Sequence, residues 1–192
     1  MNARPWPTIR KAKLVVGKSL SFRDTKVDDA AFILSLRTDE KKSQYLSAVS
    51  TDLSAQQAWL ESYANSQGQA YFIIEYQKEP IGTVRLYDAQ QDSFCWGSWV
   101  LIDERPPHAA MESALMVYSY AVDHLKFKNA HFTVHKGNQR VWRFHERFGA
   151  QRIKEDEIEF FYSVSSLAIE KSRIKYAKFL ASSVEVPSGL SK

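Results

Sequence analysis

The order of segments along this chain of 192 residues predicts one α/β domain on a mixed, twisted sheet, with an antiparallel N-terminal half and helices on both faces. Two helical segments precede three consecutive strand-like segments, and a strand–helix–strand unit, a helix and a hairpin follow. The length suits one buried core and is short for two. We expect the domain to span 13–181, between a loose basic arm over 1–12 and a loose tail over 182–192.

The first elements are two short strands and two helices. The predicted strands are Lys13–Val16 and Ser19–Arg23, which are rich in β-branched and apolar residues. A hydroxyl and a carboxylate three residues apart in Thr25–Asp28 form a capping box, which predicts a helix that ends near Arg37. Ser54–Gln57 forms a second capping box, which predicts the start of the next helix.

Aromatic and β-branched residues then predict three antiparallel strands. The first two, Ala70–Tyr76 and Ile81–Tyr87, are joined by a short polar turn and form a hairpin. The third is Ser93–Leu101, and Gly97 in its middle indicates a bulge or a close backbone approach. Apolar residues at helical spacing predict a long helix over 109–125.

The remaining elements repeat the alternation of strand and helix. Ala130–Val134 is a short strand, and a helix over 138–148 begins at an asparagine and ends before Gly149, a typical left-handed C-terminal residue. Ile158–Val164 belongs to a final hairpin, and an amphipathic helix spans 166–181. A strand followed directly by a helix places a helix N-terminus at the sheet edge, which suits an anionic ligand such as a phosphate.

The net charge of +4 is unevenly distributed along the chain. Residues 1–18 carry +5 and residues 166–192 carry +3, whereas residues 19–165 carry −4. A groove that follows phosphates would place the excess of bases on the folded body, so we expect no nucleic-acid partner. An RNA- or membrane-associated protein that uses its basic ends is the less favoured alternative. The acidic body is instead suited to attracting a cationic amine.

Several kinds of site are excluded by missing motifs. The chain has no glycine-rich phosphate loop, no dinucleotide fingerprint and no hydrolase elbow. Cys95 is the only cysteine, which excludes an internal disulfide and suggests a reducing, cytoplasmic location. Cys95 lies within a predicted strand, where a cysteine is more often a structural thiol than a nucleophile. His131 and His135 lack the frame of a zinc motif, so we expect no metal. No apolar run is long enough to span a membrane.

Two local patterns, together with the order of elements, resemble the GNAT superfamily of acyl-CoA-dependent N-acyltransferases over most of residues 13–165. The most specific is Asn138–Ala150, which is similar to the family pattern Asn-x-x-small-x-x-apolar-Tyr-Glu-Lys-x-Gly-Phe. Other segments resemble the branch that contains ribosomal-protein-alanine acetyltransferases. These are Lys13–Gly17, Ser21–Arg23, Asp28–Ala30, Trp59 and Ile81–Leu86.

The resemblance implies that acetyl-CoA binds around 100–112 and at the start of the helix over 138–148. The residues it assigns to this role are Val100, Leu101, Ile102, Arg105, His108, Ala109, Ala110, Asn138 and Trp142. The loop departs from the family pattern, because Pro106 and Pro107 remove two backbone donors and His108 stands where glycine is usual. A protonated His108 would itself pair with a phosphate. For Trp142, packing in the core is the alternative.

The resemblance also implies direct transfer, in which an amine attacks the thioester and strand N–H groups near 100–102 stabilise the tetrahedral intermediate. His145 replaces the family tyrosine that protonates the departing thiolate, unless it merely packs on its helix. The candidate bases are Asp88 and Glu75. The alternative is that both carboxylates are simply solvated at the surface and that a water relay removes the proton instead.

The predicted function is therefore an acetyl-CoA-dependent N-acetyltransferase that acts on a primary amine. The acceptor is a protein N-terminus, a small-molecule amine or a nucleotide-linked amino sugar, and loops over 38–53, 88–93 and 155–160 are expected to build its pocket. The alternative is a degenerate member that binds a ligand or partner without catalysis, which the altered loop after Arg105 suggests. The oligomeric state is left open, a homodimer included.

Overall fold

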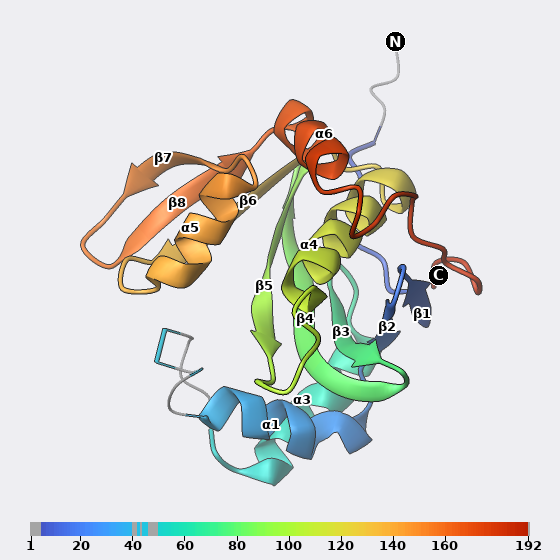
Figure 1. The fold of residues 1–192 in the computed structure, drawn as a ribbon. Coiled ribbons are helices and arrows are strands. Elements are labelled where there is room, and N and C mark those ends of the chain that lie inside the picture. The colour runs from blue at the N-terminus through green and yellow to red at the C-terminus, as the bar shows by residue number, and fades with distance from the viewer. Residues whose placement is uncertain (1–4, 40–41, 43, 46–49, 192) are drawn as a thin grey trace.

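The computed structural model of this chain describes residues 5–39, 42, 44–45 and 50–191. Its strands are β1 (Leu14–Val16), β2 (Leu20–Asp24), β3 (Ala70–Tyr76), β4 (Glu79–Gln90), β5 (Ser93–Leu101), β6 (Asn129–His135), β7 (Gln151–Glu155) and β8 (Glu159–Val164). They form one eight-stranded sheet in the order β1-β2-β3-β4-β5-β6-β8-β7 (Figure 1). Every neighbouring pair is antiparallel except β5 and β6, which confirms the predicted mixed sheet with an antiparallel N-terminal half.

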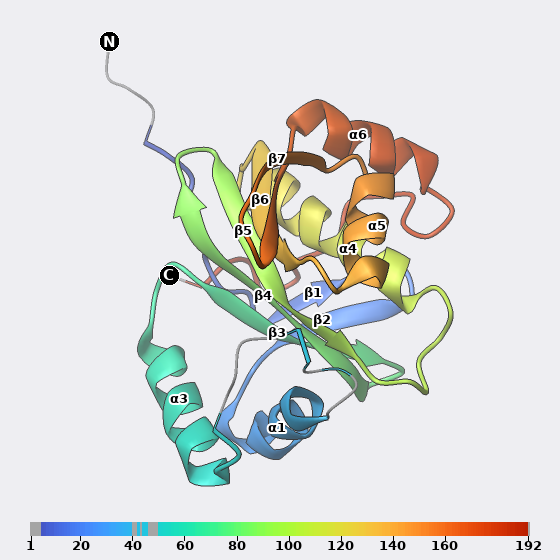
Figure 2. The same cartoon turned by 90° about the vertical axis from the view of Figure 1, so that its left-hand side faces the viewer.

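Helices cover both faces of this sheet, as predicted. They are α1 (Ala30–Thr38), α3 (Leu53–Asn65), α4 (Ala109–Ser119), α5 (Gln139–Arg147) and α6 (Ser166–Lys175). Figure 2 shows α1 and α3 on one side of the sheet and α4 on the other, together with α5 and α6. In the described part of the chain, no helix has the length and apolar character needed to cross a membrane.

Each face of the sheet has its own hydrophobic core, because successive side chains of a strand point to opposite faces. In β3, Phe72 and Ile74 belong to the larger core, which also contains buried residues of α4. Tyr71 and Ile73 alternate with them and pack against α1 and α3 in the smaller core. The apolar run Ala70–Ile74 of β3 thus reflects burial on both sides.

The start of the first helix differs from the predicted capping box at Thr25–Asp28. The N–H of Thr25 donates to the carbonyl of Tyr71 in β3, which ties this residue to the sheet. A short 3₁₀ turn over Val27–Asp29 therefore precedes α1. The carboxylate of Asp29, rather than that of Asp28, accepts the N–H of Lys26 at 2.7 Å.

Three other helix ends also differ from the sequence prediction. Asp52, not Ser54, caps α3, and its carboxylate accepts the Ser54 N–H at 2.9 Å, because a charged acceptor binds an N–H more strongly than a hydroxyl does. The predicted helix over 109–125 ends as a π turn over Tyr120–His124. The predicted helix over 166–181 is regular only as far as Lys175.

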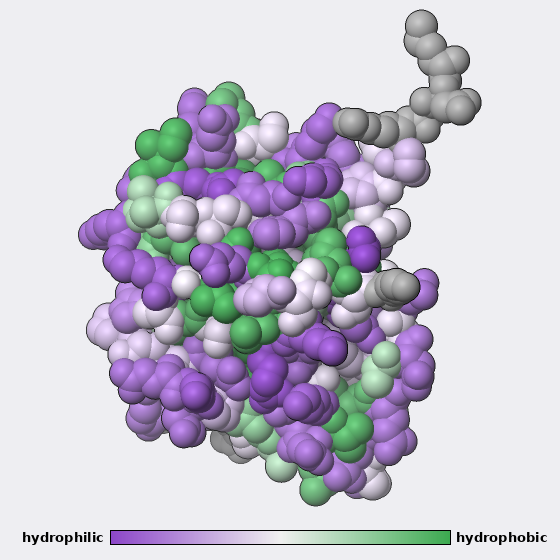
Figure 3. Space-filling view, turned by 90° about the vertical axis from the view of Figure 1, so that its right-hand side faces the viewer, coloured by the Kyte–Doolittle hydropathy of each residue, from purple (hydrophilic) through white to green (hydrophobic). Residues whose placement is uncertain are grey.

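The described parts of the basic arm and of the tail, 5–12 and 182–191, pack against each other and against the domain, although we expected both segments to be loose. Ile9 is only 2% exposed, and Ala12 pairs with Leu190 in an isolated bridge. The ammonium of Lys11 lies 3.1 Å from a carbonyl at the C-terminal end of α3, where helices favour a cation. Figure 3 shows the side near β1 and the C-terminal segment, where hydrophobic residues gather across the middle between hydrophilic ones.

The sheet opens between its two parallel strands. β5 and β6 are paired over only three residues of each strand, ending at Cys95 and His131, and they separate beyond this point (Figure 1). Directly after Gly97, where we expected a bulge, the pairing of β5 with β4 shifts register and Ser98 has a φ of 46°. The separation and the bulge together expose the second half of β5 to a set of cavities.

Candidate active site

Three cavities lie in a row where β5 and β6 separate. The outer cavity, about 430 Å³, is bounded by the end of β5, the start of α4 and the start of α5. The middle cavity, about 270 Å³, lies between β5 and β6. The arginine cavity, about 350 Å³, lies on the α1 and α3 side and is lined by Arg37 and Arg85. The outer and middle cavities share Tyr45, Trp99, Asn138 and Val141, and the middle and arginine cavities share Arg37, Tyr87 and Ser98.

The outer cavity gathers most of the predicted cofactor-binding residues. Those that line it are Val100, Leu101, Arg105, Ala110 and Asn138. Lys42 and Arg140 also line it, so three cations face one carboxylate, that of Asp103, among its described residues. Lys42 forms ion pairs with Asp39 at 2.7 Å and with Asp103 at 3.0 Å. The cavity is therefore suited to an anionic ligand.

Two predicted backbone donors are already used within the fold. The N–H of Ala109 donates to the carbonyl of Pro106 at 3.0 Å, and the N–H of Ile102 donates to the carbonyl of Ile81 at 2.9 Å. Neither residue lines the outer cavity. The proline-containing turn before α4 closes on itself, and β5 continues its pairing to β4 up to Ile102, so these two residues do not supply the expected donors.

His108 is turned away from the outer cavity, contrary to the expectation that its imidazolium pairs with a phosphate. Its Nε2 lies 2.8 Å from the hydroxyl of Ser19 and 3.7 Å from the carboxylate of Glu112. Glu112 is only 1% exposed, and its two oxygens accept the N–H and hydroxyl of Ser19 and the N–H of Leu20 at 2.6–2.9 Å. The buried carboxylate thus draws His108 towards the turn between β1 and β2.

The two residues at the start of α5 that were predicted to bind the cofactor lie in different surroundings. The indole N–H of Trp142 donates to the carbonyl of Lys136, and the ring packs edge-on against Phe160, so this residue follows its core alternative and lies outside the outer and middle cavities. Asn138 begins α5 without a capping hydrogen bond from its side chain. It lines both the outer and the middle cavity, which leaves its amide available to a ligand.

His145 lines the middle cavity from α5, within a set of aromatic rings. Its ring centroid lies 4.2 Å from that of Phe132 and 5.2 Å from that of Trp96, and the residue is 5% exposed. This burial lowers the pKa of His145 to about 3, and Nδ1 has no hydrogen-bond partner among the described residues. The imidazole is uncharged at neutral pH, because the charged form would lose its hydration among these rings. It is therefore poorly suited to protonate a thiolate.

We expect the buried imidazole to make folding stability depend on pH. Its pKa is near 6.5 in the unfolded chain and about 3 in the folded one, so the unfolded state binds more protons between these values. Stability should fall as the pH drops from about 6.5 to about 3, by at most about 1.4 kcal/mol per pH unit. Urea unfolding of the wild type and of His145→Phe between pH 4 and 7 measures this slope.

The slope of the unfolding free energy against pH should be shallower in His145→Phe than in the wild type, because this variant lacks one proton-binding group. His131→Gln is the matched control, because this histidine is partly exposed and bonds the hydroxyl of Ser93. Equal slopes in the wild type and in His145→Phe would contradict the buried, neutral imidazole.

The structure does not bring the two predicted bases to the cavities. Asp88 lies at the far end of β4, where its carboxylate is 3.3 Å from Nε2 of His131 beside the paired end of β5 and β6. Glu75 forms an ion pair with Arg23 at 2.8 Å. Neither residue lines any of the three cavities.

The sequence reasoning missed His135 and Glu159, which line the middle cavity from β6 and β8 and lie opposite each other in the strand register. We had considered His135 only as half of a metal pair and had placed Glu159 in a variable loop. In the described part of the chain, no group of three or more His, Cys, Asp or Glu residues could hold a metal ion.

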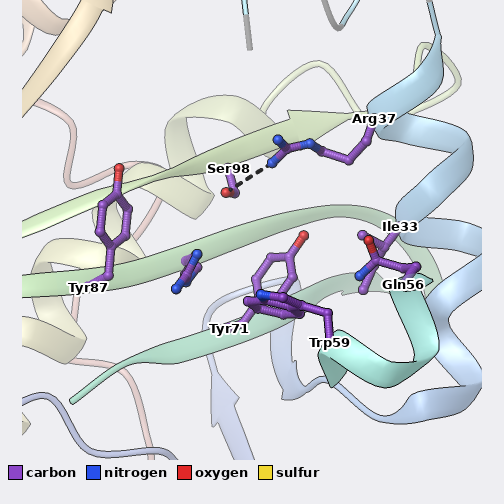
Figure 4. A pocket seen from close by; sticks show the side chains of 8 residues that line it. Ile33, Arg37, Gln56, Trp59, Tyr71, Tyr87 and Ser98 are labelled. Atoms are coloured by element: carbon purple, nitrogen blue, oxygen red, sulfur yellow. Dashed lines mark hydrogen bonds between the residues drawn. The ribbon is translucent and has the colours of Figure 1, made fainter. Parts of the chain in front are cut away.

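The arginine cavity combines two guanidinium groups with aromatic rings (Figure 4). Arg85 donates to the amide oxygen of Gln69, and its guanidinium lies 5.1 Å from the ring centre of Trp59 and 5.2 Å from that of Tyr87. Arg37 reaches across from α1 and donates to the hydroxyl of Ser98 at 3.3 Å. None of the described residues that line this cavity is acidic. Partial burial without a carboxylate lowers the pKa of Arg85.

Comparisons with known proteins place these features in a family. Residues 19–151 match the model of the acetyltransferase (GNAT) domain. The structure described as apo FdhC, a nucleotide-linked sugar GNAT, is 38% identical, covers 87% of this chain and 98% of its own, and superposes with a TM-score of 0.78. No curated protein matches the chain.

Two more distant structures share the fold alone. A GCN5-related N-acetyltransferase from Brucella melitensis is 15% identical, over 91% of this chain and 89% of its own, with a TM-score of 0.75. Spermidine N-acetyltransferase from Vibrio cholerae, in complex with CoA and spermine, is 15% identical over 79% and 98% of the two chains, with a TM-score of 0.71. The narrower resemblance to ribosomal-protein-alanine acetyltransferases stays a prediction. The match over most of the chain, with the separated strands and the row of cavities, shows that this protein belongs to the GNAT acetyltransferase family.

Proposed function

We propose that this protein transfers the acetyl group of acetyl-CoA to the amino group of a sugar carried on a nucleotide. The observation that carries the proposal is the arginine cavity, which presents two cations and three aromatic rings and shares Arg37, Tyr87 and Ser98 with the middle cavity. The 38% identity to a nucleotide-linked sugar GNAT supports the same acceptor class.

The outer cavity fits the acyl donor. Its three cations, Lys42, Arg105 and Arg140, suit the phosphates of coenzyme A. A thioester that extends from there passes Asn138 and reaches the middle cavity along the second half of β5. Because Ala109 and Ile102 use their N–H groups internally, side-chain cations have to supply more of the phosphate binding here than a glycine-rich loop would.

The arginine cavity fits an anionic acceptor better than a polycation. The diphosphate of a nucleotide-linked sugar pairs with guanidinium groups, and a nucleobase stacks on rings such as Trp59 and Tyr71. A polyamine or a free cationic peptide amine needs carboxylates, which the described lining of this cavity lacks. The sequence-based idea that an acidic body attracts a cationic amine is therefore replaced, since the charge of the cavity outweighs the average charge of the domain.

The chemistry of the proposal is direct transfer in the middle cavity, where the outer and arginine cavities meet. The amine of the sugar attacks the thioester carbon, and donors on β5 near Val100 stabilise the negative oxygen that forms. An acyl-enzyme is not required, which agrees with Cys95, whose buried thiol has its pKa raised to about 11.

A thiol-release assay with acetyl-CoA and a panel of amines tests the acceptor. We expect kcat/KM for a nucleotide-linked amino sugar to exceed that for the same sugar without its nucleotide by about 100-fold or more, since charge-assisted hydrogen bonds contribute about 1.5–3 kcal/mol each. Spermidine and a peptide with a free N-terminus are the comparison amines. Equal or higher kcat/KM for either would contradict the proposed acceptor.

Calorimetric titration with acetyl-CoA separates this enzyme from a degenerate member of the family. The two prolines before α4 and the internally bonded Ala109 motivate that alternative. We expect binding in the micromolar range, because three cations line the outer cavity. If no binding is detected at millimolar acetyl-CoA, the chain is not an acetyltransferase.

A further inference from the structure

We propose that Glu159 is the catalytic base that takes the proton from the attacking amine. This inference rests on the proposed function, because it needs the amine and the thioester to meet in the middle cavity. Glu159 and His135 both line that cavity.

The middle cavity limits the choice of base to a few side chains. It shares residues with the cavities on both of its sides, so groups that reach from either one meet here. Among the residues that the structure describes, the titratable side chains that line it are Arg37, Tyr45, Tyr87, His135, His145 and Glu159. Asp88 and Glu75, the bases expected from the sequence, lie elsewhere.

Most of these groups are unsuited to accept a proton. The guanidinium of Arg37 has no acceptor atom, and a phenol hydroxyl such as that of Tyr45 or Tyr87 is a weak proton acceptor. Burial raises the pKa of the Tyr87 phenol above its ordinary value. His145, whose pKa is lowered to about 3, is a weak base in a closed aromatic surrounding.

His135 is excluded as a base by its own hydrogen bond. Its Nδ1 accepts the N–H of Gly137 at 3.0 Å, so the lone pair on Nδ1 is occupied and the proton of the neutral ring sits on Nε2. The ring is also fixed by Tyr45, whose centroid lies 4.9 Å away. His135 is therefore a donor through Nε2, not an acceptor.

Glu159 remains as an acceptor-only group with a suitable position. It begins β8 directly opposite His135 of β6, a spacing at which side chains on adjacent strands interact. Within the described residues, its carboxylate has no hydrogen bond or ion pair, while its own N–H is held by Asp156 at 2.7 Å. Lys136, the residue after β6, and Glu155, at the end of β7, pair with each other at 3.6 Å.

The proton and the electrons can be followed through the step. The lone pair of the uncharged amine forms the C–N bond, and the π electrons of the thioester carbonyl move to its oxygen. The nitrogen, now positive, gives one proton to the carboxylate of Glu159. The carbonyl re-forms as the C–S bond breaks, and the thiolate of coenzyme A takes that proton from Glu159, directly or through water.

The test is turnover of the best acceptor by Glu159→Gln and by Glu157→Gln. Glu157 lies two residues away in the exposed turn of the same hairpin and lines none of the three cavities, which makes it the matched control. We expect Glu159→Gln to lower kcat about 10²- to 10⁴-fold and Glu157→Gln to leave it unchanged. The calorimetric Kd for acetyl-CoA and the melting temperature should match those of the wild type in both variants.

The pH profile distinguishes the base from a structural role. The wild type should lose kcat/KM on the acid side as the carboxylate is protonated, and Glu159→Gln should lose this limb. His135→Gln should retain the limb, because this substitution leaves the carboxylate of Glu159 in place. Full activity of Glu159→Gln, or an unchanged acid limb, overturns this inference alone, whereas a wild type that acetylates no amine overturns the proposed function.

Discussion

Arg85→Gln is expected to lower kcat/KM for a nucleotide-linked amino sugar about 10- to 150-fold. The guanidinium is the cation between Trp59 and Tyr87, and no carboxylate in the described lining of the arginine cavity neutralises it. Loss of one charge-assisted hydrogen bond to a phosphate costs about 1.5–3 kcal/mol, and each 1.4 kcal/mol is a factor of ten. Steady-state kinetics with the acceptor varied at saturating acetyl-CoA measures this change.

The effect should be confined to the nucleotide part of the acceptor. The KM for acetyl-CoA should stay within about twofold, because Arg85 does not line the outer cavity. Arg143→Gln is the matched control, since this arginine lies over Trp142 on α5, away from the arginine cavity. If Arg85→Gln lowers kcat/KM for the free amino sugar as much as for the nucleotide-linked one, the arginine does not bind the nucleotide.

Glu112→Ala is expected to lower the free energy of unfolding by about 3–5 kcal/mol. The carboxylate is fully buried in the first turn of α4, where it accepts hydrogen bonds from Ser19 and Leu20. Its removal leaves the buried N–H of Leu20 and the part-buried N–H of Ser19 without their protein partner, and an unpaired buried N–H costs about 1–3 kcal/mol. Urea unfolding followed by far-UV circular dichroism measures the loss.

The same substitution should also weaken acetyl-CoA binding, because the first turn of α4 borders the outer cavity through Ala110. Glu170→Ala is the control for an exposed glutamate on a helix, and it should change the unfolding free energy by less than about 0.5 kcal/mol. A loss below about 1 kcal/mol in Glu112→Ala would show that the three hydrogen bonds contribute little to the fold.

The sequence predicted the strands well because burial on both faces leaves a clear signal. Ala70–Ile74 of β3 form an unbroken apolar run, and these residues divide between two cores. The helix ends were less predictable. Thr25 and Asp52 show why, since the cap depends on whether the backbone of the residue is also held by the sheet, or whether its side chain competes with a neighbouring carboxylate. A distant bond, such as that between Thr25 and Tyr71, leaves no periodic pattern in the sequence.

The residues of the candidate site likewise divide into those that the sequence predicted and those that only the structure placed. Val100, Arg105 and Asn138 meet in the outer cavity because they lie at strand and helix ends that the order of elements already brings together. His108 carries the right chemistry at the expected position, yet it turns towards Glu112, whose partners lie more than 90 residues away in the chain. Glu159 escaped notice because only the register of β8 against β6 places it beside the middle cavity.

By itself, the sequence determined the fold class, the succession of strands and helices, the family resemblance and the lack of a nucleophile at Cys95, because these depend on local periodicity and on motifs that are contiguous in the chain. Only the tertiary structure decided the sign of charge in each cavity and the protonation of His145. Both depend on the desolvation and the neighbours of a group, and segments far apart in the sequence supply them, such as the arginines of α1 and β4. A net charge of −4 over residues 19–165 therefore coexists with an arginine-lined cavity within that body.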